Sequence, residues 1–499
     1  MLNLSVVLDS AARLHPDRAA VVCGEQVYSY AELNRRARQV AELVRARGVR
    51  PGDRVVLICP NLPEFPVVYY GLLKAGVVVV PLNPLLKERE LEFVFGDSGA
   101  VMVFAWEGTE HLPVLENARR AAVAAGVREV VALSGLAELL APRPGEADSE
   151  PTGAEDPAVI IYTSGTTGTP KGAALSHVSL LLNARMKDLL IPRHEHDVAL
   201  VALPLYHIFG QTSVLNGNVH TGGTLVLLPR FEPGTALDLL VEHRVTLFAG
   251  VPSMFQAFLQ ADPKGVRLRK AAETIRLITS GGAPLPVAVF ERVKELSGLQ
   301  IQQGYGLSET SPTVTFCPWD EPLRPASVGK PVWGVDIQVV DRAGTRVPAG
   351  TVGEIVVRGH CVMLGYFNRP EATAEAIRDG WFHTGDLGRF DEDGWLYVVD
   401  RVKDLILRGG YNVYPAEVEQ VLLHHPAVAM TAVVGQPHER LGQEVVAYVV
   451  PRIGHRIDVG ELSAFARERL AEYKYPRHII VQSELPLTAT GKVHKRALS

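Results

Sequence analysis

The sequence predicts an α/β protein whose N-terminal part contains doubly wound, mainly parallel sheets. Short apolar runs with a strand pattern alternate with helical stretches along the first third of the chain. This alternation is typical of parallel strands joined by helical crossovers. The chain has 499 residues, too many for one ordinary hydrophobic core, so we expect two or more domains.

The N-terminal elements each carry a local signal. Gly24 and Glu25 separate two short apolar runs and predict a tight hairpin. Ser29 and Glu32 form a capping-box pattern before a helix that should stop at Gly48. The expected elements that follow are a strand over Arg54–Cys59, a helix over Pro63–Ala75 and a strand over Val77–Pro81.

Composition limits the class of protein. The chain is 47% hydrophobic and 21% charged with a net charge of −5, which gives no reason to expect nucleic acid as a partner. Its four cysteines have no paired spacing, which argues against a zinc site and is typical of a reducing cytoplasm. The sequence contains no apolar stretch of membrane-spanning length and no signal-peptide pattern. We therefore expect a cytoplasmic enzyme without an integral membrane segment.

The most informative stretch is a loop rich in glycine and hydroxyl groups. It follows an apolar run over Ala158–Ile161, which predicts a buried strand, and precedes Ser176, which can cap a helix beginning near Val178. Glycines let the backbone turn tightly and point N–H groups at a ligand. The chain has no Walker A pattern. Taken alone, such a loop is either a polar surface turn or a polyphosphate site. The polyphosphate site would be formed by Thr163, Ser164, Gly165, Thr166, Thr167, Gly168 and Lys171.

An exposed connector and a second α/β passage flank this loop. Residues Ala141–Asp156 contain almost no apolar side chains, so we expect a solvent-exposed connector there. Further strands are expected over Val198–Leu203, Thr246–Ala249, Ile275–Thr279 and, in a smaller β-subdomain, Gly353–Gly359, with helices over Pro233–His243 and after Pro252.

Candidate ligand-binding residues gather in three short stretches downstream of the loop. Tyr305 could stack on a base, Ser308 could donate to a phosphate, and Glu309 could hold Mg²⁺, which prefers a few carboxylates together with phosphate oxygens. Asp386 lies in a glycine-flanked turn where a carboxylate can accept bonds from ribose hydroxyls. His207 follows a predicted strand at its carboxyl end, where open α/β sheets bind ligands.

Seven motifs between Ala158 and Lys492 resemble, in order, those of the adenylate-forming superfamily, which contains acyl-CoA synthetases, luciferases and the adenylation domains of peptide synthetases. The resemblance implies that Arg401 joins Asp386 at the ribose, and that His207 borders the acid pocket. Besides the loop, it implies that ATP and AMP contact Gly282, Ala283, Tyr305, Gly306, Ser308, Asp386 and Arg401.

The resemblance also implies two domains: an AMP- and acid-binding domain over 1–400, and a small mobile α+β lid over 401–499 that carries the catalytic lysine. Lys403 matches the hinge of the family, and Gly409 and Gly410 lie where the pantetheine arm of CoA passes. Lys492 occupies a Pro-x-x-x-x-Gly-Lys pattern, and its ammonium would bridge the substrate carboxylate and the α-phosphate, which repel each other. The residues expected to take part in catalysis are Lys492, His207 and Glu309.

The implied activity is that of an AMP-forming acyl-CoA synthetase, which uses ATP, Mg²⁺ and CoA. Ile208 stands where amino-acid-activating relatives have Asp, which argues against an α-amino acid. The segment after it has no Arg or Lys for a second carboxylate, which argues against malonate. The expected acyl pocket is largely apolar and contains His207, Ile208, Gln211, Gly250, Gly281 and Gly304.

We expect a medium- or long-chain fatty acid first and an aromatic acid such as a cinnamate second. The acceptor could instead be the phosphopantetheine of a carrier protein acting in trans. A luciferase-like oxygenase and a non-enzymatic nucleotide-binding module are the remaining alternatives, and a homodimer is possible.

Overall fold

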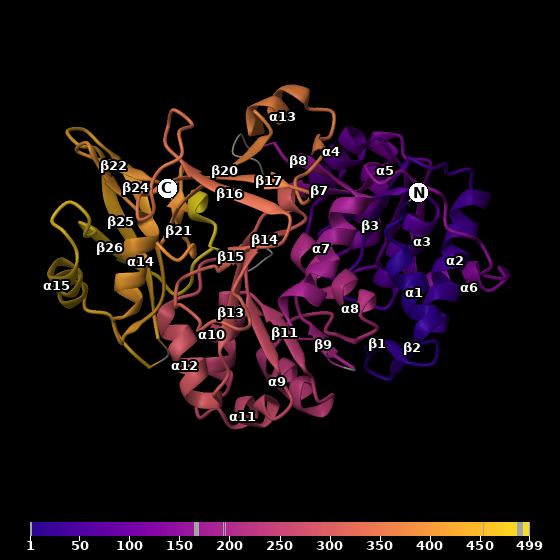
Figure 1. Cartoon of the computed structure of the whole chain (residues 1–499), viewed down its shortest axis with the longest axis horizontal. Helices are drawn as coiled ribbons and strands as arrows, with labels where there is room; N and C mark the ends of the chain where they lie inside the picture. The colour runs from indigo at the N-terminus through magenta and orange to yellow at the C-terminus, as the bar shows by residue number, and fades with distance from the viewer. Residues whose placement is uncertain are drawn as a thin grey trace.

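The computed structural model describes residues 2–163, 169–192, 194, 196–452, 454–486 and 493–498. It has a large N-terminal part and a small C-terminal part, which lies at the left of Figure 1. The strands form four sheets with seven, nine, five and five members. The predicted α/β fold with a large and a small part is confirmed.

The first sheet contains the apolar runs of the N-terminal third and is ordered β18-β8-β7-β4-β3-β5-β6. The strands are β3 (Arg54–Ile58), β4 (Val78–Leu82), β5 (Ala100–Ala105), β6 (Glu129–Ala132), β7 (Pro157–Thr163), β8 (Lys171–Ser176) and β18 (Gly365–Tyr366). Strands β7, β4, β3, β5 and β6 pair in parallel, as predicted, but β8 and β18 pair antiparallel. Only residues 164–170 separate β7 from β8, too few for the crossover that parallel pairing requires. The sheet is therefore mixed, and the phosphate loop joins two antiparallel strands instead of leading from a strand to a helix.

The second sheet is ordered β15-β14-β13-β12-β11-β9-β10-β1-β2 and is also mixed. Its strands are β1 (Ala19–Cys23), β2 (Gln26–Ser29), β9 (Val198–Val201), β10 (Thr224–Leu227), β11 (Leu247–Gly250), β12 (Leu277–Ser280), β13 (Ile301–Gly306), β14 (Thr313–Phe316) and β15 (Lys330–Pro331). The six strands from β13 to β1 are parallel, and antiparallel strands close both edges.

Helices fill the space between the two sheets and cover their outer faces. The helices near the first sheet and between the sheets are α1 (Val6–Leu14), α2 (Tyr30–Ala46), α3 (Glu64–Lys74), α4 (Glu88–Ser98), α5 (Val114–Ala125), α6 (Leu136–Leu140), α7 (His177–Leu190) and α8 (Gly217–His220). Helix α2 contacts β1 and β2, while α3 packs on α2 and contacts β3 and β4, so this pair is shared by both sheets.

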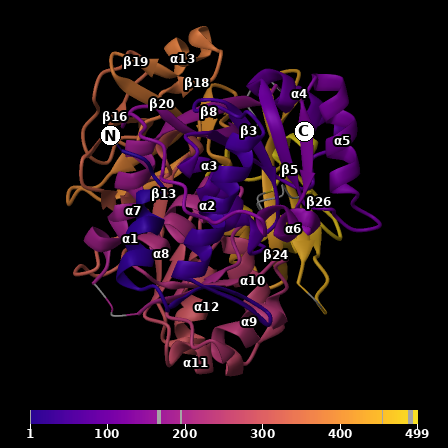
Figure 2. The same ribbon diagram turned by 90° about the vertical axis from the view of Figure 1, so that its right-hand side faces the viewer.

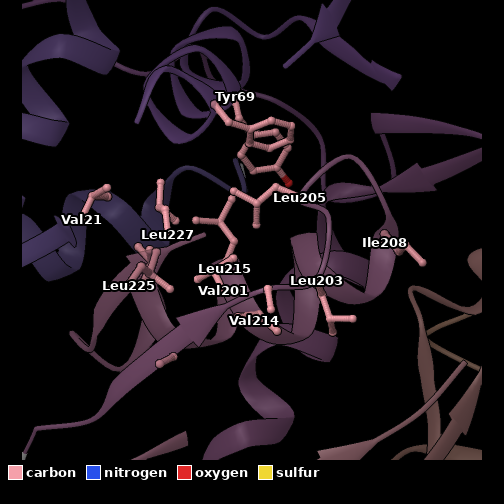
Figure 3. Packing of buried hydrophobic residues seen from close by; sticks show 14 of the residues in the cluster. Val21, Tyr69, Val201, Leu203, Leu205, Ile208, Val214, Leu215, Leu225 and Leu227 are labelled. Carbon is pink, nitrogen blue, oxygen red and sulfur yellow. The ribbon is translucent and has the colours of Figure 1, made fainter. Parts of the chain in front are cut away.

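The outer helices of the second sheet are α9 (Pro233–Glu242), α10 (Pro252–Ala261), α11 (Val266–Ala272) and α12 (Val287–Ser297). Three of them, α9, α11 and α12, lie at the lower end of the molecule in both Figure 1 and Figure 2. Figure 3 shows part of the core beneath the sheet, where Leu215, Leu225 and Leu227 pack close to Val201.

The local signals act as predicted. The Ser29 hydroxyl accepts a bond from the Glu32 amide and Ser176 accepts one from the Ser179 amide, which caps α2 and α7. The connector over 141–156 forms no helix or strand, as expected. It is not simply solvated, however, because the Glu42 carboxylate on α2 accepts bonds from three of its backbone amides.

The third sheet is the antiparallel β-subdomain. It consists of β16 (Val335–Val340), β17 (Gly353–Gly359), β19 (Ile377–Arg378), β20 (Trp381–Phe390) and β21 (Leu396–Arg401), with helix α13 (Pro370–Ala376) between β18 and β19. Strand β17 spans the predicted residues. In Figure 1 this sheet lies in the upper middle of the molecule, between the C-terminal part at the left and strands β7 and β8 at the right.

The C-terminal part has a sheet of its own. It comprises β22 (Ile406–Arg408), β23 (Tyr411–Val413), β24 (Val428–His438), β25 (Gly442–Pro451) and β26 (His478–Val481), with helices α14 (Pro415–Leu423) and α15 (Val459–Arg469). Among the described residues, no buried cluster combines side chains from before residue 400 with side chains from after it. The boundary between 400 and 401 stays a prediction, and this separation of cores is consistent with it.

No helix within the described residues is long and apolar enough to cross a membrane.

A buried ion cluster near β9 makes a prediction about acid stability. Asp197 accepts bonds from Arg276 at 2.8 and 2.7 Å, and Lys187 Nζ lies 3.2 Å from it. Burial alone would raise the pKa of Asp197, but Arg276 and Lys187 overcome this effect and lower it to about 2. Because the folded pKa lies below the unfolded value, the carboxylate stabilises the fold above about pH 4, and this contribution is lost as the pH falls toward about 2.

We expect Asp197→Asn to lower the melting temperature at pH 7, because it leaves two cations near a neutral amide. The difference from wild type should shrink progressively below about pH 4. Thermal unfolding followed by circular dichroism at several pH values measures this. The control is Asp336→Asn, since the Asp336–Arg358 pair is exposed on both sides. A deficit of Asp197→Asn that does not change with pH would contradict the assignment.

Candidate active site

A cavity of about 1660 Å³ lies where the first two sheets, the β-subdomain and the C-terminal part meet. It opens at the carboxyl ends of β11, β12 and β13, where open α/β sheets bind ligands. The predicted site residues that line it are Thr163, Lys171, His207, Ile208, Gly281, Gly282, Ala283, Gly304, Tyr305, Gly306, Ser308, Glu309, Asp386, Arg401 and Lys403. Residues far apart in the sequence therefore meet in one cavity.

In the wall of the cavity a carboxylate faces the base of the phosphate loop. Thr163 and Lys171 are paired residues on β7 and β8, at the two ends of the loop. The Thr163 hydroxyl lies 3.4 Å from Glu309 Oε1, on the short 3₁₀ turn Ser308–Thr310. The Tyr366 hydroxyl donates to the same oxygen at 3.0 Å. Glu309 is buried, so its carboxylate has a fixed position.

Tyr366 is a site residue that the sequence reasoning missed. It lies on β18, next to β8, and lines the cavity. Burial and then the negative charge of Glu309 raise the pKa of its phenol, which therefore stays protonated and can donate. The available signal was the Gly365-Tyr366 pair shortly after the β17 segment, in a stretch for which no element was predicted.

Elsewhere in the cavity wall a second carboxylate binds a tyrosine and an arginine. Asp386 on β20 and Arg401 on β21 are directly paired in register, and Arg401 Nε lies 2.9 Å from Asp386 Oδ1. The Tyr305 hydroxyl donates to Asp386 Oδ2 at 2.7 Å. The charge of Asp386 raises the pKa of Arg401, while burial and then Asp386 raise the pKa of Tyr305. These neighbours orient the carboxylate, so its oxygens can accept hydrogen bonds from the hydroxyl groups of a ligand.

Two glycines show why small residues are needed in the cavity walls. Gly282 has φ +81°, a left-handed conformation that other residues rarely adopt. At Gly306 a Cβ atom would lie 1.7 Å from the Pro312 carbonyl oxygen, so a larger residue would displace β14. Both glycines let the backbone itself form the wall against which a ligand would lie.

The segment after His207 forms a π-helix over Phe209–Asn216, a form that is frequent at functional sites. Nδ1 of His207 accepts a bond from the Phe209 amide at 3.3 Å. Ile208 lines the cavity, and Figure 3 shows its side chain apart from the packed group around Leu215.

The helix brings into the cavity two residues that were not predicted. Phe209 and Ser213 line it, one helical turn apart, whereas Gln211 is fully buried and its amide donates to the Leu205 carbonyl at 3.4 Å. The helical period was the missed signal, because residues four apart share a face. Gly250 also stands back from the cavity lining, where a Cβ would contact the Phe248 and Phe255 rings.

The remaining predicted residues lie in the C-terminal part or in the phosphate loop. Lys403 lies in the turn between β21 and β22, at the junction of the two parts. Gly409 and Gly410 form the turn between β22 and β23, both with positive φ, and do not line the cavity. Ser164, Gly165, Thr166, Thr167, Gly168 and Lys492 lie outside the described residues.

The donors around Glu309 fit a magnesium ion that is shared with phosphates. Within the part of the chain that is described, no group of three or more His, Cys, Asp or Glu could hold a metal alone. One buried carboxylate beside a hydroxyl is a hard-oxygen donor set that Mg²⁺ accepts when phosphate and water oxygens complete its shell. The residues present therefore fit a metal that arrives with its phosphate ligand.

Two family models cover most of the chain. Residues 8–367 match the AMP-binding enzyme family, and residues 417–492 match the C-terminal domain of AMP-binding enzymes. Among curated proteins, a feruloyl-CoA synthase of Amycolatopsis sp. is 41% identical over 97% of this chain and 96% of its own length. The long-chain-fatty-acid–CoA ligase of Bacillus subtilis is 34% identical over 99% of this chain and 93% of its own.

Solved structures of MatB from Rhodopseudomonas palustris give the same result for the fold. The ATP-bound form superposes with a TM-score of 0.91 at 33% identity, over 100% of this chain and 98% of that one. The apo form of the same protein, over the same shares of both chains, has a TM-score of 0.81. The arrangement of this chain is thus nearer to that of the ATP-bound relative.

Proposed function

The chain belongs to the AMP-binding enzyme family, and from that premise we propose that it is an AMP-forming acyl-CoA synthetase. The observation that carries the proposal is the single cavity that joins the base of the phosphate loop, Glu309, and the Asp386–Arg401 pair. An acid, a ribose and a polyphosphate can be held there in line. In the first half-reaction a carboxylate oxygen of the substrate attacks the α-phosphorus of ATP, and pyrophosphate leaves.

When ATP binds for this half-reaction, Lys171 and the loop residues would bind its β- and γ-phosphates. Asp386 would accept hydrogen bonds from the ribose hydroxyls. Glu309 and the Thr163 hydroxyl face the position of Mg²⁺, which when bound would neutralise phosphate charge. The side chains position the reactants and stabilise charge, and they form no covalent bond with the substrate.

For the second half-reaction we propose that the C-terminal part rotates about Lys403. The rotation would withdraw Lys492 and present the Gly409–Gly410 turn to the pantetheine arm. The thiol sulfur then attacks the acyl carbon, AMP leaves and the thiol proton passes to solvent. The different TM-scores to the ATP-bound and apo forms of one relative support a joint between the parts. The Gly409–Gly410 turn also has open space beside it for the pantetheine arm, because a Cβ at Gly410 would meet nothing within 4 Å.

For the acid we propose a molecule with a large apolar body. The sequence favoured a fatty acid, but the higher identity to a feruloyl-CoA synthase supports the aromatic alternative, and Phe209 offers a ring in the cavity wall. The acceptor is CoA, with a carrier-protein phosphopantetheine as the alternative. A homodimer and a cytoplasmic location stay predictions.

Pyrophosphate release with ATP and Mg²⁺ tests this proposal directly. The panel is acetate, octanoate, palmitate, cinnamate and ferulate, each with and without CoA. We expect one acid class to give release that CoA accelerates, together with one equivalent of AMP. Release that ignores CoA would indicate a carrier-protein acceptor, and absence of release with every acid would contradict the proposed function.

A further inference from the structure

Tyr366 contacts two groups that approach the phosphate site from different parts of the chain. Its hydroxyl donates to Glu309 Oε1 at 3.0 Å, and Lys171 Nζ lies 5.2 Å from the centre of its ring. The first contact orients a carboxylate and the second is a cation–π contact with an ammonium. One side chain thus touches both a negative and a positive group of the site.

The backbone fixes Tyr366 in this place. Strand β18 pairs with β8, with Tyr366 opposite Ala173, and β8 pairs with β7, so Tyr366, Lys171 and Thr163 lie on three consecutive strands. The Phe367 amide donates to the Gly172 carbonyl at 2.7 Å, just beyond Lys171.

The turn that carries Glu309 is tied to the same segment. The Met363 amide donates to the Glu309 carbonyl at 2.8 Å, so both the backbone and the side chain of Glu309 bind to residues near β18. Arg369 adds an outer anchor, because it pairs with Asp97, which also accepts the Tyr162 hydroxyl at 2.7 Å. Asp97 therefore connects Tyr162 on β7 to Arg369, which follows β18 in the chain.

We propose that Tyr366 is a positioning residue with two separable effects, in which its hydroxyl orients Glu309 toward the metal and its ring holds the Lys171 ammonium toward the phosphates. The inference rests on the proposed function, since it assumes that ATP and Mg²⁺ bind in this cavity. A carboxylate without its phenol donor can rotate, and an ammonium without a π-face loses an electrostatic partner. The hydroxyl therefore affects metal-dependent binding, and the ring affects nucleotide binding as such.

The test is equilibrium binding of ATP by calorimetry, with and without Mg²⁺, to three forms of the full chain. Tyr366→Phe keeps the ring, so we expect its ATP affinity without Mg²⁺ to stay within about twofold of wild type. With Mg²⁺ its affinity should fall by about fivefold to tenfold, a loss of the size expected for one ordinary hydrogen bond. Tyr366→Leu removes both contacts, and its affinity should already fall by about fivefold without Mg²⁺.

The matched control is Tyr30→Phe, which deletes a buried phenol bond to the Gly223 carbonyl, and neither of these residues lines the cavity. It should leave ATP affinity unchanged in both conditions, even if the melting temperature falls. If Tyr366→Leu does not fold, Tyr366→Met repeats that arm with a similar volume and no π-face.

The outcomes separate the two claims. A wild-type chain that binds no ATP would contradict the proposed function itself. Wild-type binding that Mg²⁺ strengthens, with the same Mg²⁺ effect in Tyr366→Phe, would overturn only the role of the hydroxyl and hence this inference. Identical behaviour of Tyr366→Phe and Tyr366→Leu would overturn the separate role of the ring.

Discussion

A Lys492→Ala variant is expected to lose adenylate formation by about 10²–10³-fold while it still converts a supplied acyl-adenylate to the thioester. The reason is electrostatic: the attacking carboxylate and the α-phosphate repel each other until a cation neutralises both. The second half-reaction has no such pair of anions, because the acyl carbon is attacked by a thiol. Pyrophosphate release measures the first step, and CoA thioester formation from synthetic acyl-adenylate measures the second.

The control for this prediction is Lys270→Ala, which removes an exposed lysine paired with Glu273 on the surface. Both half-reactions of the control should match wild type. Equal loss of both half-reactions in Lys492→Ala would count against the rotating-lid account, because it would place the lysine in both arrangements.

An Asp386→Asn variant is expected to weaken ATP binding by about 10²-fold, through the loss of charged hydrogen bonds at the ribose position. The change is nearly isosteric, so the packing survives. The Arg401 guanidinium, however, loses the carboxylate 2.9 Å from its Nε, and the Tyr305 hydroxyl loses a charged acceptor. Calorimetric titration with ATP and with AMP measures the effect, and both nucleotides should weaken alike, since both carry the ribose.

The same β-subdomain offers a matched control. Asp391 also binds an arginine and a tyrosine, Arg324 at 2.6 Å and Tyr397 at 3.2 Å, but it does not line the cavity. Asp391→Asn therefore deletes the same kind of cluster and should leave nucleotide affinity unchanged. If both variants lost affinity equally, the effect of Asp386 would be one of folding and not of ligand contact.

Local signals explain why much of the fold could be predicted. The hairpin at Gly24, the caps at Ser29 and Ser176 and the strand over Gly353–Gly359 depend on neighbouring residues only, and the structure contains all four. No strand was predicted at the position of β8, because its antiparallel pairing with β7 depends on the length of one loop and on which strand lies next to it.

The predicted site divides in the same way. Thr163, Lys171, Tyr305, Glu309 and Asp386 each occur in a short motif and meet in the cavity. Gln211 was expected in the pocket but points into the core, and Phe209 and Ser213 take its place. The sequence positions alone do not say which side chains of a helix face the cavity. The structure was needed to show that Gln211 lies on the buried face.

By itself the sequence determined the family and the order of its motifs, because each motif is a contiguous string whose residue types reflect local chemistry. Only the tertiary structure decided which groups touch. Tyr366 reaches Glu309 across 57 positions of sequence, and Asp386 reaches Tyr305 across 81. Such contacts follow from strand order and register, which arise when the whole core packs and many distant residues are buried together.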